Sequence, residues 1–161
     1  MPSSLPCDAP PCDAVPDERL RLIVDSYRRL TGKELLDEIP DNDEALHHPL
    51  WNAPRAIVAH GTEADPVFFY GNRLALELFE MSFEDFTRLP SRFSAEPLER
   101  DARARLLERV ARQDYVDDYA GVRISGKGKR FMIEAATVWN LIDEAGNHRG
   151  QAATFSDWRA L

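Results

Sequence analysis

The pattern of apolar and polar positions predicts one amphipathic helix near the start of the chain, over residues 16–32. Pro16 suits a first helical turn and Gly32 suits a helix end. Apolar residues recur between them at helical spacing, at Leu20, Ile23, Val24, Tyr27 and Leu30. These positions form one apolar stripe that must be buried against another surface.

From residue 55 the pattern changes to the period of β-strands. Residues 55–62 and 66–71 are short runs rich in β-forming residues, and the turn between them predicts a hairpin. Asn72 follows directly and is suited to cap a helix, because its side-chain oxygen accepts a bond from an unpaired helix N–H. Ser82, with Asp85 three residues later, predicts a second, short helix.

The last part of the chain predicts a long helix followed by strands. Residues 97–113 carry an apolar stripe at helical spacing, at Ala102, Leu106, Leu107 and Val110. Three strand-like runs follow, joined by glycine-containing turns that favour antiparallel hairpins, at residues 117–125, 129–143 and 148–158. We therefore predict an α+β fold: a five-stranded antiparallel sheet, with helices inserted between strands two and three and packed on one face.

Composition and charge narrow the possible partners. The chain has 161 residues, 43% of them hydrophobic, which is enough for one domain with its own core. The net charge is −8, but residues 1–50 carry 11 acidic and 5 basic residues, against 17 and 15 in the remainder. The main domain is nearly neutral, which argues against nucleic acid or an anionic membrane as a partner.

Four segments follow from these patterns: a disordered tail over residues 1–15, the helix at 16–32, an acidic connector at 33–54 and the main domain at 55–158. Cys7 and Cys12 lie in the tail without a nearby histidine, which favours a reduced, flexible segment over a metal site. The chain has neither an apolar run of roughly 20 residues nor a signal peptide, so we expect a cytoplasmic protein.

The order of elements and several separated motifs resemble the MEKHLA domain, a PAS-related family. The motifs are HHPLW (47–51), FFYGNRLALELFE (68–80), LPSRFSAEP (89–97), DYAGVRIS (118–125), AATVWNL (135–141) and GQAATFSDW (150–158). The resemblance covers residues 45–158 and implies a PAS-like sensory or protein-interaction module. It implies neither a particular ligand nor catalytic residues.

PAS-like domains often hold a small molecule between the sheet and its helices, so the residues expected there are candidates for ligand binding, in a cavity of roughly a few hundred Å3. They are Asn72, Phe79, Phe86, Arg92, Phe93, Arg123, Phe131, Thr137 and Trp139. Each has a structural alternative. Asn72 is first of all a helix cap, Arg92 either clamps an anion or pairs with Glu96, and Trp139 is either core or cavity wall.

Strand alternation predicts which side chains of residues 129–143 face the helices. The more apolar set consists of Phe131, Ile133, Ala135, Thr137, Trp139 and Leu141. This set is expected to face the helices.

Cofactor chemistry is restricted by residue types. Covalent flavin photochemistry requires a cysteine shortly after Asn72, and the sequence has none beyond Cys12. Haem requires an axial ligand, and none of His47, His48, His60 and His148 is predicted on a helix facing the sheet. Noncovalent flavin stays open. No nucleophile motif, phosphate loop or metal-ligand spacing predicts an enzyme.

Three functions remain. The first is a stand-alone sensory or interaction module that binds an unidentified small molecule and signals through homodimer contacts. The second is a dimerising scaffold without a ligand, and the third is a small cavity enzyme of isomerase or hydrolase type. We expect the stripe of residues 16–32 to lie at the two-fold interface of a homodimer. The alternative is that the helix covers its own sheet.

Overall fold

The computed structural model describes residues 9–95 and 97–161, so Cys7 and most of the predicted tail lie outside the described residues. Its elements are α1 (Asp17–Thr31), η1 (Glu44–Leu46), α2 (His47–Trp51), β1 (Ala56–His60), β2 (Phe68–Gly71), α3 (Arg73–Phe79), α4 (Phe83–Phe86), η2 (Ser91–Ser94), α5 (Pro97–Gln113), β3 (Tyr115–Ile124), β4 (Arg130–Ile142), β5 (His148–Phe155) and β6 (Asp157–Ala160). The predicted order of helices and strands is confirmed. Among the described residues, no helix is both long and apolar enough to cross a bilayer.

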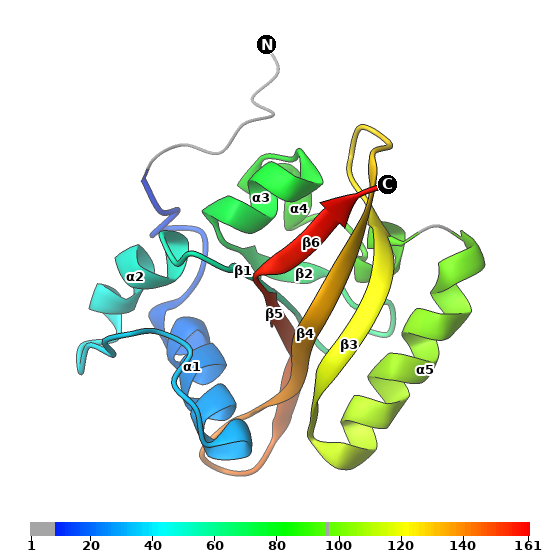
Figure 1. Cartoon of the computed structure of the whole chain (residues 1–161). Helices are drawn as coiled ribbons and strands as arrows, with labels where there is room; N and C mark the ends of the chain where they lie inside the picture. Colours follow the sequence, from blue (N-terminus) through cyan, green and yellow to red (C-terminus); the bar gives the residue numbers. More distant parts are fainter. Residues whose placement is uncertain (1–8, 96) are drawn as a thin grey trace.

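The strands form one antiparallel sheet in the order β2-β1-β5-β4-β3. A sixth strand, β6, was not predicted and pairs with residues 131–134 of β4. The chain bends at Ser156, so β5 pairs with the second half of β4 and β6 with the first half. Helices cover both faces of the sheet: α1 lies on one side, and α3, α4 and α5 lie on the other (Figure 1).

Strand β4 contains an extra residue. Tyr119 of β3 pairs with Ala136 of β4. Gly121, two residues further along β3, pairs with Ile133, three residues back along β4. Ala135 lies in this interval with φ of 50°, in the left-handed region. This is a β-bulge, and one inserted residue reverses the faces on which all later side chains of the strand lie.

The bulge corrects the prediction that alternate residues from Phe131 to Leu141 share one face. Phe131 and Ile133, before the bulge, pack with α3 and α4. Trp139 and Leu141, after it, pack in the core that includes α1. Trp139 is fully buried there, with its ring centroid 4.8 Å from that of Tyr27 in an edge-to-face arrangement.

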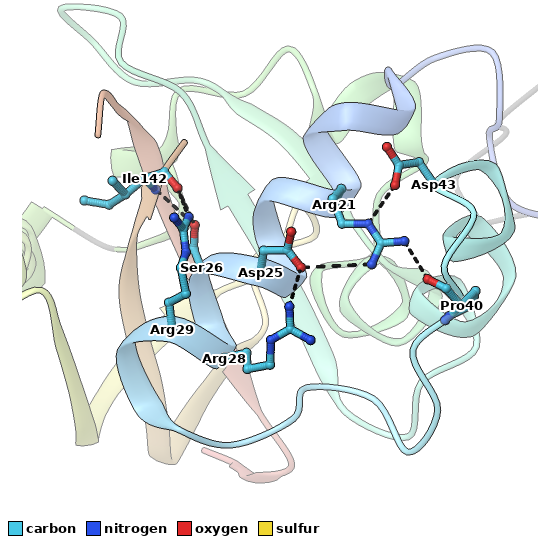
Figure 2. A network of polar contacts seen from close by, with 8 residues as sticks. All are labelled: Arg21, Asp25, Ser26, Arg28, Arg29, Pro40, Asp43 and Ile142. Carbon is cyan, nitrogen blue, oxygen red and sulfur yellow. Dashed lines mark hydrogen bonds and ion pairs between the residues drawn. The ribbon is translucent and has the colours of Figure 1, made fainter. Parts of the chain in front are cut away.

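Helix α1 is held on its own sheet by polar contacts as well as by its stripe (Figure 2). The Ser26 hydroxyl donates to the backbone oxygen of Ile142 at 3.1 Å and accepts from its N–H at 3.0 Å. Arg29 also donates to the Ile142 oxygen. On the other side of the helix, Arg21 pairs with Asp43 at 2.7 Å and donates to the Pro40 oxygen. These contacts join α1 to the end of β4 and to the connector.

The apolar stripe of α1 is therefore covered within its own chain, as in the intramolecular alternative. Leu20, Ile23, Val24 and Tyr27 are at most 4% exposed, and Leu30 is partly buried. The first four side chains therefore have almost no surface left to offer a second copy. The connector at 33–54 contributes to the same core, because Leu46 and Leu50 of its two short helices are fully buried.

Candidate functional site

A small cavity lies between the sheet and α5, where PAS-like domains are expected to hold a ligand. Its apolar wall comes from both layers and includes Val58, Phe79, Leu106, Ile133, Val138 and Phe155. Its polar lining comes from separate elements: His60, Ser94, Arg103, Tyr119, Arg123 and Gln151. The sheet and the inserted helices thus bring together groups that are far apart in the sequence.

The volume of this cavity is about 50 Å3, which corrects the expected few hundred Å3. One water requires about 10–15 Å3 on this measure, so the space holds about three to five water-sized groups. Neither a flavin nor a haem fits such a space. Among the described residues, no group of three or more His, Cys, Asp or Glu side chains is placed to hold a metal ion.

Arg103 of α5 reaches the cavity although it is only 8% exposed. Burial, together with the smaller effect of the positive charge of Arg123, lowers the pKa of its guanidinium to about 10. The group still carries a full charge at neutral pH. Among the residues that the structure describes, Arg103 is in no side-chain hydrogen bond or ion pair.

Arg123 of β3 is the second buried cation of the cavity, also 8% exposed. Its Nη1 donates to the backbone oxygen of Val122 at 2.8 Å, and its Nη2 donates to the Tyr119 hydroxyl at 2.9 Å. The guanidinium also lies 5.3 Å from the centroid of the Tyr119 ring. These neutral partners fix its position but leave its charge uncompensated.

His60 at the end of β1 lines the same cavity and is 8% exposed. Desolvation lowers its pKa to about 4, against the smaller opposing effect of the Gly61 carbonyl, so the ring is neutral at pH 7. Its Nδ1 donates to the Gly61 oxygen at 3.0 Å, which leaves Nε2 as an acceptor. Within the described residues, this buried Nε2 has no hydrogen-bond partner.

Gln151 of β5 fixes the distance between the sheet and α5. Its amide nitrogen donates to the backbone oxygen of Leu107 and to Oδ1 of Asn140, both at 3.1 Å. Asn140 in turn donates to the backbone oxygen of Val110 at 3.0 Å. The helix that covers the cavity is thereby hydrogen-bonded to β4 and β5.

Two of the predicted ligand-binding residues, Phe79 and Arg123, line the cavity. Phe86 and Phe131 instead belong to an aromatic cluster beside it. The ring centroids are 4.2 Å apart for Phe68 and Phe86, and 5.3 Å apart for Phe79 and Phe131. This cluster packs between the sheet and the helices α3 and α4.

Asn72 has a structural role that its cap position only partly predicted. Its Oδ1 accepts from the N–H groups of Ala75 and Ile57, at 3.2 and 3.0 Å. Its Nδ2 donates to the backbone oxygens of Leu50 and Arg55, at 3.1 and 2.8 Å. The side chain is fully buried and all its hydrogen-bonding capacity is used, so it does not face a ligand.

The remaining predicted ligand-binding residues lie elsewhere. Arg92 pairs with Asp65 at 3.0 Å, both half-exposed, and its guanidinium lies 4.1 Å from the Phe93 ring. Glu96, its predicted partner, lies outside the described residues. Phe93 is 39% exposed. Neither Thr137 nor Trp139 contributes to the cavity, since both follow the bulge in β4.

The sequence interpretation missed Arg103 and left His60 as an ordinary buried or edge histidine. A signal for Arg103 was present: Arg103, Leu106, Leu107 and Val110 fall at i, i+3, i+4 and i+7, so a basic residue occupies the apolar stripe of α5. His47 and His48 lie in the connector, as predicted, on its short helix α2. His47 is buried and its Nε2 is 2.7 Å from Oδ1 of Asp17.

Solved structures with the same arrangement are PAS domains. The PAS domain of a two-component sensor histidine kinase aligns with a TM-score of 0.57 and 17% identity, over 73% of this chain and 95% of that chain. The light-state dimer of the fungal blue-light photoreceptor Vivid aligns with a TM-score of 0.55 and 14% identity, over 81% and 91%. At these identities the similarity establishes the PAS fold alone.

Curated relatives are plant proteins that are much longer. The homeobox-leucine zipper protein HOX9 of Oryza sativa subsp. indica is 30% identical over 138 residues, 86% of this chain and 16% of that protein. ATHB-14 of Arabidopsis thaliana is 28% identical over 142 residues, 86% and 17%. The chain thus spans about a sixth of their length. The MEKHLA domain model matches residues 17–160, which include α1 as well as the predicted core, so the chain belongs to the MEKHLA domain family.

Proposed function

We propose that this chain is a PAS-like sensory module that binds a small molecule in the cavity between the sheet and α5. The observation that carries the proposal is the lining itself: polar groups of α5, β1, β3 and β5 converge on an otherwise apolar space. Convergent polar groups in an apolar cavity are the usual composition of a ligand site.

The core offers a route by which occupancy reaches α1. Ala152 of β5 lines the cavity and also belongs to the core that includes α1. It pairs across the strands with Trp139, whose ring contacts Tyr27 of α1. A shift of β5 on ligand binding changes the packing of α1, which is the output element that we propose.

The proposal includes a homodimer as the form that transmits the signal. Vivid, a photoreceptor with this fold, has been crystallised as a light-state dimer. Because the apolar stripe of α1 is buried in its own chain, the contacts between copies must use other surfaces. Sedimentation at tens of micromolar, with and without the bound compound, measures whether a dimer forms and whether it responds.

We do not propose catalysis. The Ser94 hydroxyl donates to the Ser91 backbone oxygen at 2.7 Å instead of to a base. The neutral ring of His60 has a carbonyl, not a carboxylate, as the partner of its Nδ1. This geometry provides no activated nucleophile.

Native mass spectrometry of freshly purified protein, compared with its denatured mass, tests for a bound compound. Ala153→Val adds two methyl groups to the cavity lining, whereas Ala120→Val places the same groups at an exposed position of β3. We expect the unmutated protein and Ala120→Val to carry an additional mass that Ala153→Val lacks.

The second candidate function is a scaffold without a ligand, and the small volume of the cavity favours it. The aromatic side chains of Phe68, Phe79, Phe86 and Phe131 pack against one another beside this cavity. If the native mass equals the sequence mass and no compound in a metabolite panel raises the melting temperature, the scaffold replaces the sensory module.

A further inference from the structure

Two arginines from different elements share one small cavity. Arg103 is on α5 and Arg123 is on β3, both are only 8% exposed, and the positive charge of Arg123 acts on Arg103. The described residues that line the cavity include no carboxylate. A like-charge pair in an apolar, desolvated space is costly unless an anion lies between the two groups.

The available donors suit an oxyanion. An arginine guanidinium has five N–H donors in a planar fork that matches the two oxygens of a carboxylate. Arg123 uses two of its donors on Val122 and Tyr119. Arg103 uses none on any residue that the structure describes.

The volume of the cavity and its apolar lining favour a short carboxylic acid over inorganic phosphate. The space of about 50 Å3 corresponds to a molecule of about three to five non-hydrogen atoms. Phe79, Leu106 and Ile133 line the same space, so hydrocarbon suits the part of the ligand that lies against these side chains. An inorganic phosphate would place charged oxygens against these side chains, whereas a short carboxylic acid places carbon there.

We propose that the cavity binds a short-chain monocarboxylate, with its carboxylate between Arg103 and Arg123 and its alkyl group against the apolar wall. The proposal rests on the proposed function, in which this cavity is the ligand site. It adds the chemical class of the ligand and assigns the two arginines as its anchors.

The test uses sodium propionate as the probe, by thermal shift and isothermal titration calorimetry on the full chain. Propionamide has the same shape without the charge, and sodium chloride and sodium phosphate at equal ionic strength control for salt. We expect propionate to raise the melting temperature above all three controls. A result in which propionate acts no differently from chloride or propionamide overturns the proposal. This comparison needs no variant.

Variants then locate the site. Arg103→Gln and Arg123→Gln should each weaken propionate binding at least tenfold, because each removes a charge-assisted bond to the carboxylate. Arg105→Gln is the matched control, since Arg105 is on the same helix but exposed. Equal losses from Arg103→Gln and Arg105→Gln would show a general charge effect and overturn the assignment.

Failure of this inference is distinguishable from failure of the proposed function. If native mass spectrometry detects a bound compound without a carboxylate, and propionate does not displace it, the sensory module stands and the ligand class is wrong. If neither a native compound nor propionate binds, both proposals fail and the scaffold remains.

Discussion

Asn72→Ala is expected to lower the free energy of unfolding by about 4–6 kcal/mol. The side chain makes four hydrogen bonds to backbone groups of α2, α3, β1 and the residue before β1. Each buried bond contributes about 1–1.5 kcal/mol, and its loss leaves a buried group without a partner. Because a domain of this size has a total stability of about 5–15 kcal/mol, the loss is a large fraction of it.

Ser82→Ala is the matched control, because Ser82 is also a helix N-cap. It makes one exposed capping bond to the Asp85 N–H at 3.1 Å, so its removal should cost only about 1 kcal/mol. Urea unfolding followed by tryptophan fluorescence measures both variants, since Trp51 and Trp139 are buried. If the two substitutions cost the same, Asn72 is only a cap and the four-bond account is refuted.

Three further perturbations test other parts of the structure. His60 has a pKa of about 4 in the folded state against 6.5 in the unfolded chain, so the free energy of unfolding should fall by up to about 3 kcal/mol as the pH drops from 6.5 toward 4. Urea unfolding curves measured over this pH range test the effect, and His60→Gln should make the unfolding free energy less dependent on pH. Leu20→Asp together with Val24→Asp should lower the free energy of unfolding by more than about 4 kcal/mol, because both side chains are buried within their own chain. The mass measured by sedimentation should stay the same, and a changed mass with little loss of stability would contradict this packing. Ala135→Gly should raise the free energy of unfolding by roughly 0.5–1 kcal/mol, and with it the melting temperature, because glycine adopts a φ of 50° without strain. A lower melting temperature would argue against the bulge.

The sequence by itself determined the elements that depend on local interactions. The stripe of α1, the caps at Asn72 and Ser82 and the order of the predicted helices and strands along the chain all appear in the structure as predicted. Helical periodicity and capping involve residues within a few positions of one another, so they are readable without knowledge of the tertiary fold. The family resemblance is confirmed for the same reason, because its motifs lie on these elements.

The faces of the sheet were decided only by the tertiary structure. Nothing in the run from Phe131 to Leu141 indicates an inserted residue, since Ala135 and Ala136 fit a regular strand as well as a bulge. The bulge arises where β4 exchanges its partner from β6 to β5. It places Trp139 in the core beneath α1, on the opposite face from the one predicted, because a shift of one residue transfers every later side chain to the other face.

The lining of the candidate site depends on tertiary structure in the same way. Local pattern identified Phe79, and a polar strand position suggested Arg123, but Arg103 and His60 become neighbours only when α5 packs over β1 and β3. The sequence also could not show where the stripe of α1 is buried, because an apolar stripe can pack equally well on the sheet of its own chain or on a second copy. The structure supplies that cover from the same chain, because the bulge and the strand order leave Trp139 and Leu141 on the face that α1 reaches.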